Sequence, residues 1–162
     1  MLGLLTGMKT KLKWIFGALV VGFGLLQFTN PARTNPPVVN DLAATNAPPP
    51  EVATLLRAAC YDCHSHETKW PLYSRIAPSS WLVVSDVNEG RKHLNFSDWP
   101  TDPAAVAKKL DRINEVLDYR QMPPAKYTML HPEARLTEDQ RKQIMDWTDA
   151  AANKLRATST NR

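Results

Sequence analysis

The stretch from Asp102 to Leu117, DPAAVAKKLDRINEVL, decides the fold class of this chain. It opens with an aspartate and a proline, which favour the N-cap and the first position of a helix. Apolar residues then recur every three or four positions, which predicts a helix with one buried face. The residues on that face are Val106, Leu110, Ile113 and Leu117.

The same helical spacing occurs in three other stretches. One of them begins with Thr137 and Gln140, a capping-box pattern that marks the start of a helix. The apolar faces of the three are Val52, Leu55, Leu56 and Ala59, then Val83, Val87 and Leu94, then Ile144, Trp147, Ala151 and Leu155. Because no β-branched alternation of useful length occurs, we predict an all-α domain. Its expected loops, at 61–79, 95–102 and 120–136, are long, which suggests that a non-protein group fills its centre.

The composition is that of a globular domain with additional segments. Of the 162 residues, 43% are hydrophobic and 22% are charged, which excludes a largely disordered chain. The net charge of +4 arises from Lys9, Lys11, Lys13 and Arg33, which lie in a region without acidic residues. The other 16 basic residues balance the 16 acidic ones, all of which follow residue 40. We therefore expect no nucleic-acid partner.

An apolar run from Trp14 to Phe28 follows the three lysines. Lysines before such a run are typical of an export signal and stay on the cytoplasmic side. Because no small-x-small cleavage site follows, we predict that residues 1–28 form an uncleaved signal anchor, a transmembrane helix, in preference to a signal peptide that is removed. Residues 29–50 hold six of the 13 prolines, which predicts an extended linker that contributes nothing to a core. The domain would then occupy residues 51–158 and face the periplasm.

The chain has two cysteines, and they lie in the motif Cys60-Tyr61-Asp62-Cys63-His64. This C-x-x-C-H spacing is typical of c-type haem attachment, in which two thiols form thioethers to one haem and the adjacent histidine binds the iron. A disulfide here would close a very small loop, a redox pair would need a βαβ setting, and a zinc site would need further spaced ligands. The motif therefore predicts one covalent haem c per chain, with His64 as an iron ligand.

The second iron ligand is predicted to be Met122, in the sequence Gln121-Met122-Pro123-Pro124 between two predicted helices. A methionine opposite a histidine raises the haem potential, and the two prolines stiffen the loop that carries the sulfur. His131 is the most serious alternative, and Met129 is a weaker one. His66 lies too close to His64 in the chain to reach the opposite face, and His93 falls on a mostly polar helix face.

Several other side chains are candidates for the surroundings of the haem. Trp70, Tyr73, Trp81 and Trp99 would supply apolar walls and hydrogen-bond donors for the propionates. Arg75 is either a propionate partner or a surface residue. The Nδ1–H of His64 is expected to donate to a backbone carbonyl, for which that of Pro78 is the suggested acceptor.

Three stretches resemble the bacterial haem-binding domain family, small single-haem envelope proteins related to cytochrome c. They are Cys60 to Trp99, Arg33 to Val38 and Met122 to Leu136. The resemblance implies a cytochrome c-like helical fold whose first and last helices pack across each other, and an N-terminal membrane anchor. It carries the attachment residues onto Cys60, Cys63 and His64, and a Met-Pro motif onto Met122. The chain departs from the family at His66, where the family usually has asparagine.

We therefore expect a membrane-anchored periplasmic cytochrome that passes single electrons between transient redox partner proteins. The sequence shows no nucleophile–base pair or acid dyad, so an electron carrier is favoured over an enzyme. A haem enzyme or a gas or redox sensor with an open distal face is the alternative. A third reading is a haem-free module in which Cys60 and Cys63 form a disulfide.

Overall fold

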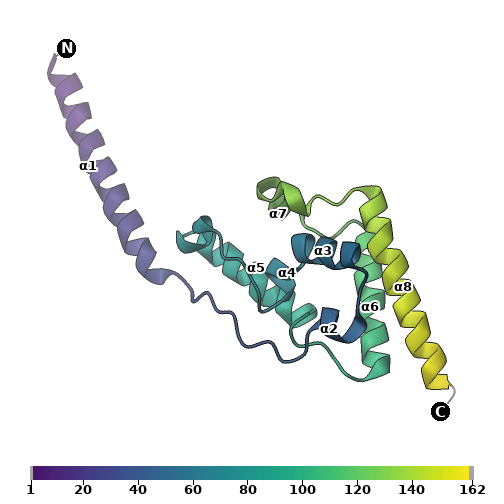
Figure 1. Ribbon diagram of the computed structural model, residues 1–162. Coiled ribbons are helices and arrows are strands. Elements are labelled where there is room, and N and C mark those ends of the chain that lie inside the picture. Colours follow the sequence, from purple (N-terminus) through teal and green to yellow (C-terminus); the bar gives the residue numbers. More distant parts are fainter. Residues whose placement is uncertain (1, 161–162) are drawn as a thin grey trace. The chain divides into compact units, whose positions relative to one another are not determined.

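The computed structural model describes residues 2–160 and is helical, with no strand in that range (Figure 1). The prediction of an all-α chain is confirmed. The chain divides into two compact units. The first unit consists of Met1–Arg33 and Trp70–Ser85, and the second of Thr34–Lys69 and Asp86–Arg162. Helix α5 (Ser79–His93) begins in the first unit and ends in the second.

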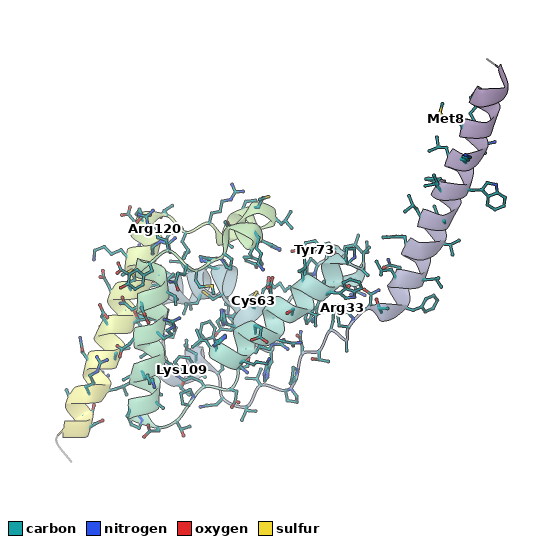
Figure 2. All side chains as sticks on the ribbon, turned by 180° about the vertical axis from the view of Figure 1, so that it is seen from behind. Met8, Arg33, Cys63, Tyr73, Lys109 and Arg120 are labelled. Carbon is teal, nitrogen blue, oxygen red and sulfur yellow. The ribbon has the colours of Figure 1, made fainter. Side chains whose placement is uncertain are left out.

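The first unit contains the long apolar helix α1 (Leu2–Leu26), the short 3-10 helices η1 (Gln27–Thr29) and η2 (Leu72–Arg75), and the start of α5. The segment Lys11–Thr29 is long and apolar enough to cross a membrane, and none of it is buried within the protein. A membrane anchor and an export signal both meet this criterion of length and composition. Met8 lies toward the N-terminal end of α1, and Arg33 follows the other end of that helix (Figure 2).

The second unit contains six further helices besides the end of α5. They are α2 (Leu42–Asn46), α3 (Pro50–Ala59), α4 (Tyr61–His64), α6 (Pro103–Asp118), α7 (Ala125–Leu130) and α8 (Glu138–Thr160), with the 3-10 helix η3 (Pro132–Ala134) before α8. Helix α6 lies along α8, and α3 also packs against α8 (Figure 1). The predicted packing of the domain's first helix on its last is therefore found between α3 and α8. The two long expected loops contain short helices, namely α4 and η2 in one and α7 and η3 in the other.

The predicted helix starts of α6 and α8 are present. The Asp102 carboxylate accepts a hydrogen bond of 2.8 Å from the Ala105 amide, and Pro103 occupies the first turn. Before α8, the Thr137 amide donates to the Gln140 side chain, and the Gln140 amide donates to the Thr137 hydroxyl. These bonds satisfy amides that have no partner within the helix. The apolar stripe of α6 is buried as predicted. In α5, Val87 is buried as predicted, but Val84 is buried instead of Val83, which is only half-buried.

The proline-rich segment 29–50 was expected to contribute nothing to a core, and this is wrong for Leu42. The Leu42 side chain is 0% exposed and belongs to the main hydrophobic cluster. Asp41 caps α2, and the amides of Val39 and Asn40 both donate to the Ser97 carbonyl at 2.9 and 3.1 Å. These backbone bonds fix the chain just before α2, so a leucine at this point can be buried despite the surrounding prolines and asparagines.

We predict that Leu42→Ala lowers the free energy of unfolding by about 2–5 kcal/mol, the usual cost of emptying a fully packed leucine site. Val39→Ala is the matched control, because the Val39 side chain is 76% exposed and should change stability by less than about 0.5 kcal/mol. Both values come from denaturant unfolding of the purified protein. Equal stability of the two variants would show that residues 39–46 are not part of the folded domain.

Candidate functional site

The two cysteines and His64 lie in one tight helical turn of the second unit. Helix α3 ends at Ala59, and Cys60 joins it to α4. The amides of Cys63 and His64 both donate to the Cys60 carbonyl, at 3.2 and 2.9 Å. Both cysteines are free thiols and are half-buried (Cys63 is labelled in Figure 2). The motif therefore forms a compact unit in which two sulfurs and one imidazole are fixed by a single turn of backbone.

The surroundings of these sulfurs disfavour a negative charge. Burial raises the pKa of the Cys60 thiol to about 12 and that of Cys63 to about 11, so both carry a proton at neutral pH. A redox-active cysteine pair needs a thiolate as its nucleophile. A neutral thioether has no such requirement. Within residues 2–160 there is also no cluster of three His, Cys, Asp or Glu residues suited to a metal ion.

The His64 ring is held by the end of helix α5. Its Nδ1 lies 2.9 Å from the Gly90 carbonyl oxygen and 2.9 Å from that of Leu94. Both partners are acceptors, so Nδ1 carries the hydrogen and Nε2 keeps its lone pair. Burial also lowers the pKa of His64, which favours this neutral form. The expected donation to a backbone carbonyl is confirmed, but the suggested acceptor Pro78 is wrong, because the acceptors are the carbonyls of Gly90 and Leu94.

Gly90 allows α5 to approach the cysteine turn this closely. An ideal Cβ at this position would lie 2.6 Å from the Cys63 carbonyl oxygen and 3.2 Å from the Cys63 Cβ. The first distance is far shorter than a normal carbon–oxygen contact, and a backbone carbonyl cannot move aside as a flexible side chain can. A residue with a side chain would therefore push α5, and with it the two carbonyls that hold His64, away from the turn.

An aromatic wall extends from His64 into the core. The Phe96 ring centroid lies 6.0 Å from that of His64, 5.1 Å from that of Tyr61 and 5.9 Å from that of Trp99. The Phe96 amide also donates to the His64 carbonyl at 2.7 Å. Phe96 was not predicted as a site residue, since a single phenylalanine in a loop carries no sequence signal. Of the expected wall residues, Trp99 lies in this unit, whereas Trp70, Tyr73 and Trp81 belong to the first unit, as does the candidate propionate partner Arg75.

These residues fit a covalently attached haem. The His64 Nε2 lone pair is available for iron, and the two neutral thiols lie on the same turn. Trp99 is buried, yet its indole N–H has no hydrogen-bond acceptor within residues 2–160. A buried donor without a partner is costly, and a haem propionate is an acceptor of the required kind.

The backbone of Met122 is held by α6 and α8. The amides of Gln121 and Met122 donate to the Val116 carbonyl, at 2.9 and 3.3 Å. The Arg141 guanidinium donates from Nη1 to the Met122 carbonyl at 2.9 Å and to the Leu117 carbonyl at 3.2 Å. Met122 is half-buried. Arg141 was not predicted as a site residue, and its role depends on the packing of α8 beside the end of α6.

A side-chain bond connects this loop to the cysteine turn. The Tyr127 hydroxyl of α7 donates to Asp62 Oδ2 at 2.8 Å, and Asp62 Oδ1 accepts from the Lys69 amide at 2.9 Å. Burial and the bond to Asp62 raise the pKa of Tyr127, which keeps the hydroxyl protonated as a donor. Asp62, the second residue between the two cysteines, thus ties the loop after Met122 to the Cys60–Cys63 turn.

The other candidate ligands each have surroundings of their own. The His66 ring is engaged at both nitrogens, with the Pro37 carbonyl 2.8 Å from Nδ1 and the Asn95 amide 2.9 Å from Nε2. The ring of His131 stacks on Tyr127 with centroids 4.2 Å apart, and its Nδ1 lies 3.1 Å from Glu133. His93 and Met129 are exposed.

Arg91 connects the start of the predicted linker to the loop that follows His64. Its guanidinium donates to the Ser65 and Thr34 carbonyls at 2.8 and 2.9 Å. It also donates to the Asn35 side chain at 3.0 Å and to the Thr68 hydroxyl at 2.9 Å. Residues 34 and 35 are therefore fixed on the domain. Sequence reasoning missed this arginine, because a charged residue near a helix end is usually on the surface.

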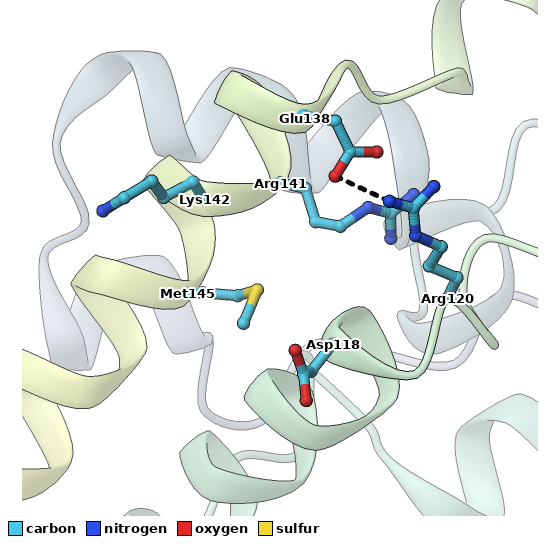
Figure 3. A pocket seen from close by; sticks show the side chains of 6 residues that line it. All are labelled: Asp118, Arg120, Glu138, Arg141, Lys142 and Met145. Carbon is cyan, nitrogen blue, oxygen red and sulfur yellow. Dashed lines mark ion pairs between the residues drawn. The ribbon is translucent and has the colours of Figure 1, made fainter.

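A depression at the C-terminal end of α6 is a poor alternative site for a large apolar ligand. Its lining residues are mostly charged, and an ion pair of 3.1 Å joins Arg120 to Glu138 across it (Figure 3). The lining consists of Asp118, Arg120, Glu138, Arg141, Lys142 and Met145. A porphyrin needs apolar walls, and this surface offers few.

Comparisons with known proteins agree with this geometry. The family described as haem-binding domain matches residues 21–150. The cytochrome c peroxidase of Escherichia coli (strain K12) is 28% identical over 97 residues, which cover 57% of this chain and 21% of that protein. The chain therefore matches only about a fifth of the length of this relative. No solved structure matches the chain.

We predict that Gly90→Ala lowers the free energy of unfolding by about 1–3 kcal/mol, because the new Cβ collides with the Cys63 carbonyl. In an unobstructed helix the same change would be stabilising. Gly22→Ala in α1 is the control, since no atom lies within 4 Å of its ideal Cβ. Thermal unfolding of the two variants in detergent provides the comparison. A Gly90→Ala protein at least as stable as the parent would contradict the close approach of α5.

Proposed function

This chain belongs to the haem-binding domain family, and from that premise we propose that it is a membrane-anchored carrier of single electrons. In this proposal one haem is attached through Cys60 and Cys63, and His64 and Met122 bind its iron. The domain would lie on the periplasmic side of a bacterial inner membrane and exchange electrons with transient redox partner proteins. The apolar segment Lys11–Thr29, with its preceding lysines, supports this location.

The observation that carries the proposal is the state of the His64 ring. Two carbonyls accept from Nδ1, which fixes the tautomer and the orientation of the ring and leaves Nε2 as the ligand atom. A histidine whose other nitrogen donates to a carbonyl is a stronger base toward a metal. Haem bound here would supply an iron that alternates between the ferrous and ferric states.

The two thiols supply the covalent attachment. Cys60 and Cys63 would each hold the haem through a thioether, with the sulfur on one carbon of a vinyl group and the thiol hydrogen on the other, so that no atom would be lost and no oxidant consumed. Thiols kept protonated by burial already carry that hydrogen. The Cys60–Cys63 turn sets the spacing of the two sulfurs, and His64 follows directly, so attachment and ligation come from the same backbone segment.

Met122 is the proposed second ligand because its backbone is positioned from two sides. The Val116 carbonyl binds its amide, and Arg141 binds its carbonyl. The Tyr127–Asp62 bond ties the following helix to the cysteine turn. A loop held at three points changes little when the charge on the iron changes, and small rearrangement favours fast electron transfer. Arg141, Tyr127 and Asp62 act here as positioning residues.

A second candidate is a peroxidase-like haem protein with an open distal face. The similarity to a protein named cytochrome c peroxidase favours this reading, although it covers a fifth of that protein. In that case Met122 would pack in its loop without binding iron. The two candidates share Cys60, Cys63 and His64 and differ at the sixth iron ligand.

We predict that the protein, produced in cells able to attach haem, keeps its haem on a denaturing gel and has the intact mass of chain plus one haem. A variant with both Cys60→Ala and Cys63→Ala should lose the haem stain, because ligation alone does not survive denaturation. Met129→Ala, an exposed position, should stain like the parent. A parent protein without stain would overturn covalent attachment.

We predict that the oxidised parent shows a sulfur–iron charge-transfer band and that its reduced form binds carbon monoxide slowly. Met122→Ala should abolish the band, lower the reduction potential and allow rapid carbon monoxide binding, because it removes the sixth ligand. Met129→Ala should change none of the three. A parent that already lacks the band and binds carbon monoxide rapidly would contradict Met122 ligation and favour the peroxidase-like candidate.

A further inference from the structure

The first unit exposes four large apolar side chains in the segment that follows the haem-attachment loop. Leu72 and Leu82 are 74% and 67% exposed, and Ile76 and Trp81 are also exposed. We refer to Leu72, Ile76, Trp81 and Leu82 as the apolar face. Four exposed apolar side chains within residues 72–82 favour a site of association there.

The segment that bears the apolar face is hydrogen-bonded to the end of the apolar helix. The Gln27 side chain pairs with both backbone groups of Ala77, accepting from its amide at 2.9 Å and donating to its carbonyl at 3.3 Å. The Trp81 indole N–H donates to the Thr29 carbonyl at 3.1 Å. The Ser80 hydroxyl donates to the Asn30 side chain.

The connection continues beyond the helix. The Arg33 guanidinium donates to the Ser74 carbonyl at 3.1 Å. Figure 2 shows Arg33 and Tyr73 near each other, just past the C-terminal end of α1. Contacts from Gln27 to Arg33 therefore hold residues 74–81 against the point where α1 ends.

We propose that the apolar face inserts into the boundary between headgroups and acyl chains of the same bilayer that α1 spans. This inference rests on the proposed membrane anchor. The lipid interface is the expected partner of the apolar face because residues 74–81 are hydrogen-bonded to the chain at the end of α1. A segment bonded to the last turn of a membrane helix lies at the depth of the lipid headgroups. Phe28, which is 89% exposed at that end of the helix, meets the same environment.

The chemistry of the face fits a lipid interface. Trp81 satisfies its polar N–H within the protein and exposes its ring, and tryptophan is enriched at the level of lipid headgroups. Arg75 is exposed on the same short segment, where its cation would meet lipid phosphates. Leucine and isoleucine side chains supply the part that enters the acyl region. The anchor would thus hold the membrane by a helix and by an adjoining surface.

Photocrosslinking in the full-length, haem-loaded protein tests this contact. p-Benzoylphenylalanine replaces Leu72, Leu82, Phe28 or Leu130, one position at a time, in nanodiscs of phosphatidylethanolamine and phosphatidylglycerol. Leu130 is the matched control, because it is 61% exposed and lies in the second unit. Phe28 reports on insertion of the anchor itself. Intact mass spectrometry after irradiation measures the fraction of chain that carries a phospholipid.

We expect phospholipid adducts at positions 28, 72 and 82, in a yield at least several-fold above that at position 130. Adducts at position 28 alone would show that α1 is inserted in the membrane and that the apolar face does not contact lipid. No adduct at any position would overturn the anchor. Equal yields at 82 and 130, or protein–protein adducts at 72 and 82, would also contradict the inference. Leu72 and Leu82 are tested separately, so misfolding of one variant does not decide the result.

Discussion

The pair of hydrogen bonds from His64 Nδ1 to the carbonyls of Gly90 and Leu94 is the constraint on which the site depends. Both acceptors lie at or just beyond the end of α5, and the Gly90 carbonyl also accepts from the Leu94 amide at 2.9 Å. The imidazole therefore shares the Gly90 carbonyl with a backbone amide. In return, the partial negative charge at that end of the helix fixes the tautomer of the ring. The arrangement requires α5 to approach the cysteine turn closely, and the missing side chain at Gly90 allows it.

Around this constraint, the second unit ties three loops to one another by polar side chains. Arg91 fixes residues 34 and 35 on the loop after His64, and Tyr127 ties α7 to Asp62. Arg141 holds the carbonyl of Met122. These hydrogen bonds position the loops, because a short loop has no apolar face that could be fixed by hydrophobic packing. A small domain that surrounds a large cofactor has little protein core, and such bonds give its loops a defined position.

The features that could be predicted from the sequence are those encoded within one short segment. The α6 stripe and the Asp102 cap depend on residues a few positions apart, and so does the C-x-x-C-H motif. The features that were missed depend on tertiary approach. The carbonyls of Pro78 and Gly90 are equally plausible acceptors for the His64 Nδ1–H until α5 is placed. Leu42 lies among prolines and asparagines, so its composition suggested a free linker, whereas backbone pairing with Ser97 brings it into the core.

The bond between Tyr127 and Asp62 limits how far the five-residue motif can be treated as a module. If residues 60–64 were transplanted into an unrelated helical scaffold, they would bring the two sulfurs and the imidazole. The host would lack the Tyr127 hydroxyl that donates to the Asp62 carboxylate. The Asp62 carboxylate would then lose the 2.8 Å hydrogen bond to its Oδ2 and would need water or a donor from the host in its place. Borrowing this motif for a designed cytochrome therefore calls for the α7 tyrosine as well, or for a neutral residue between the two cysteines.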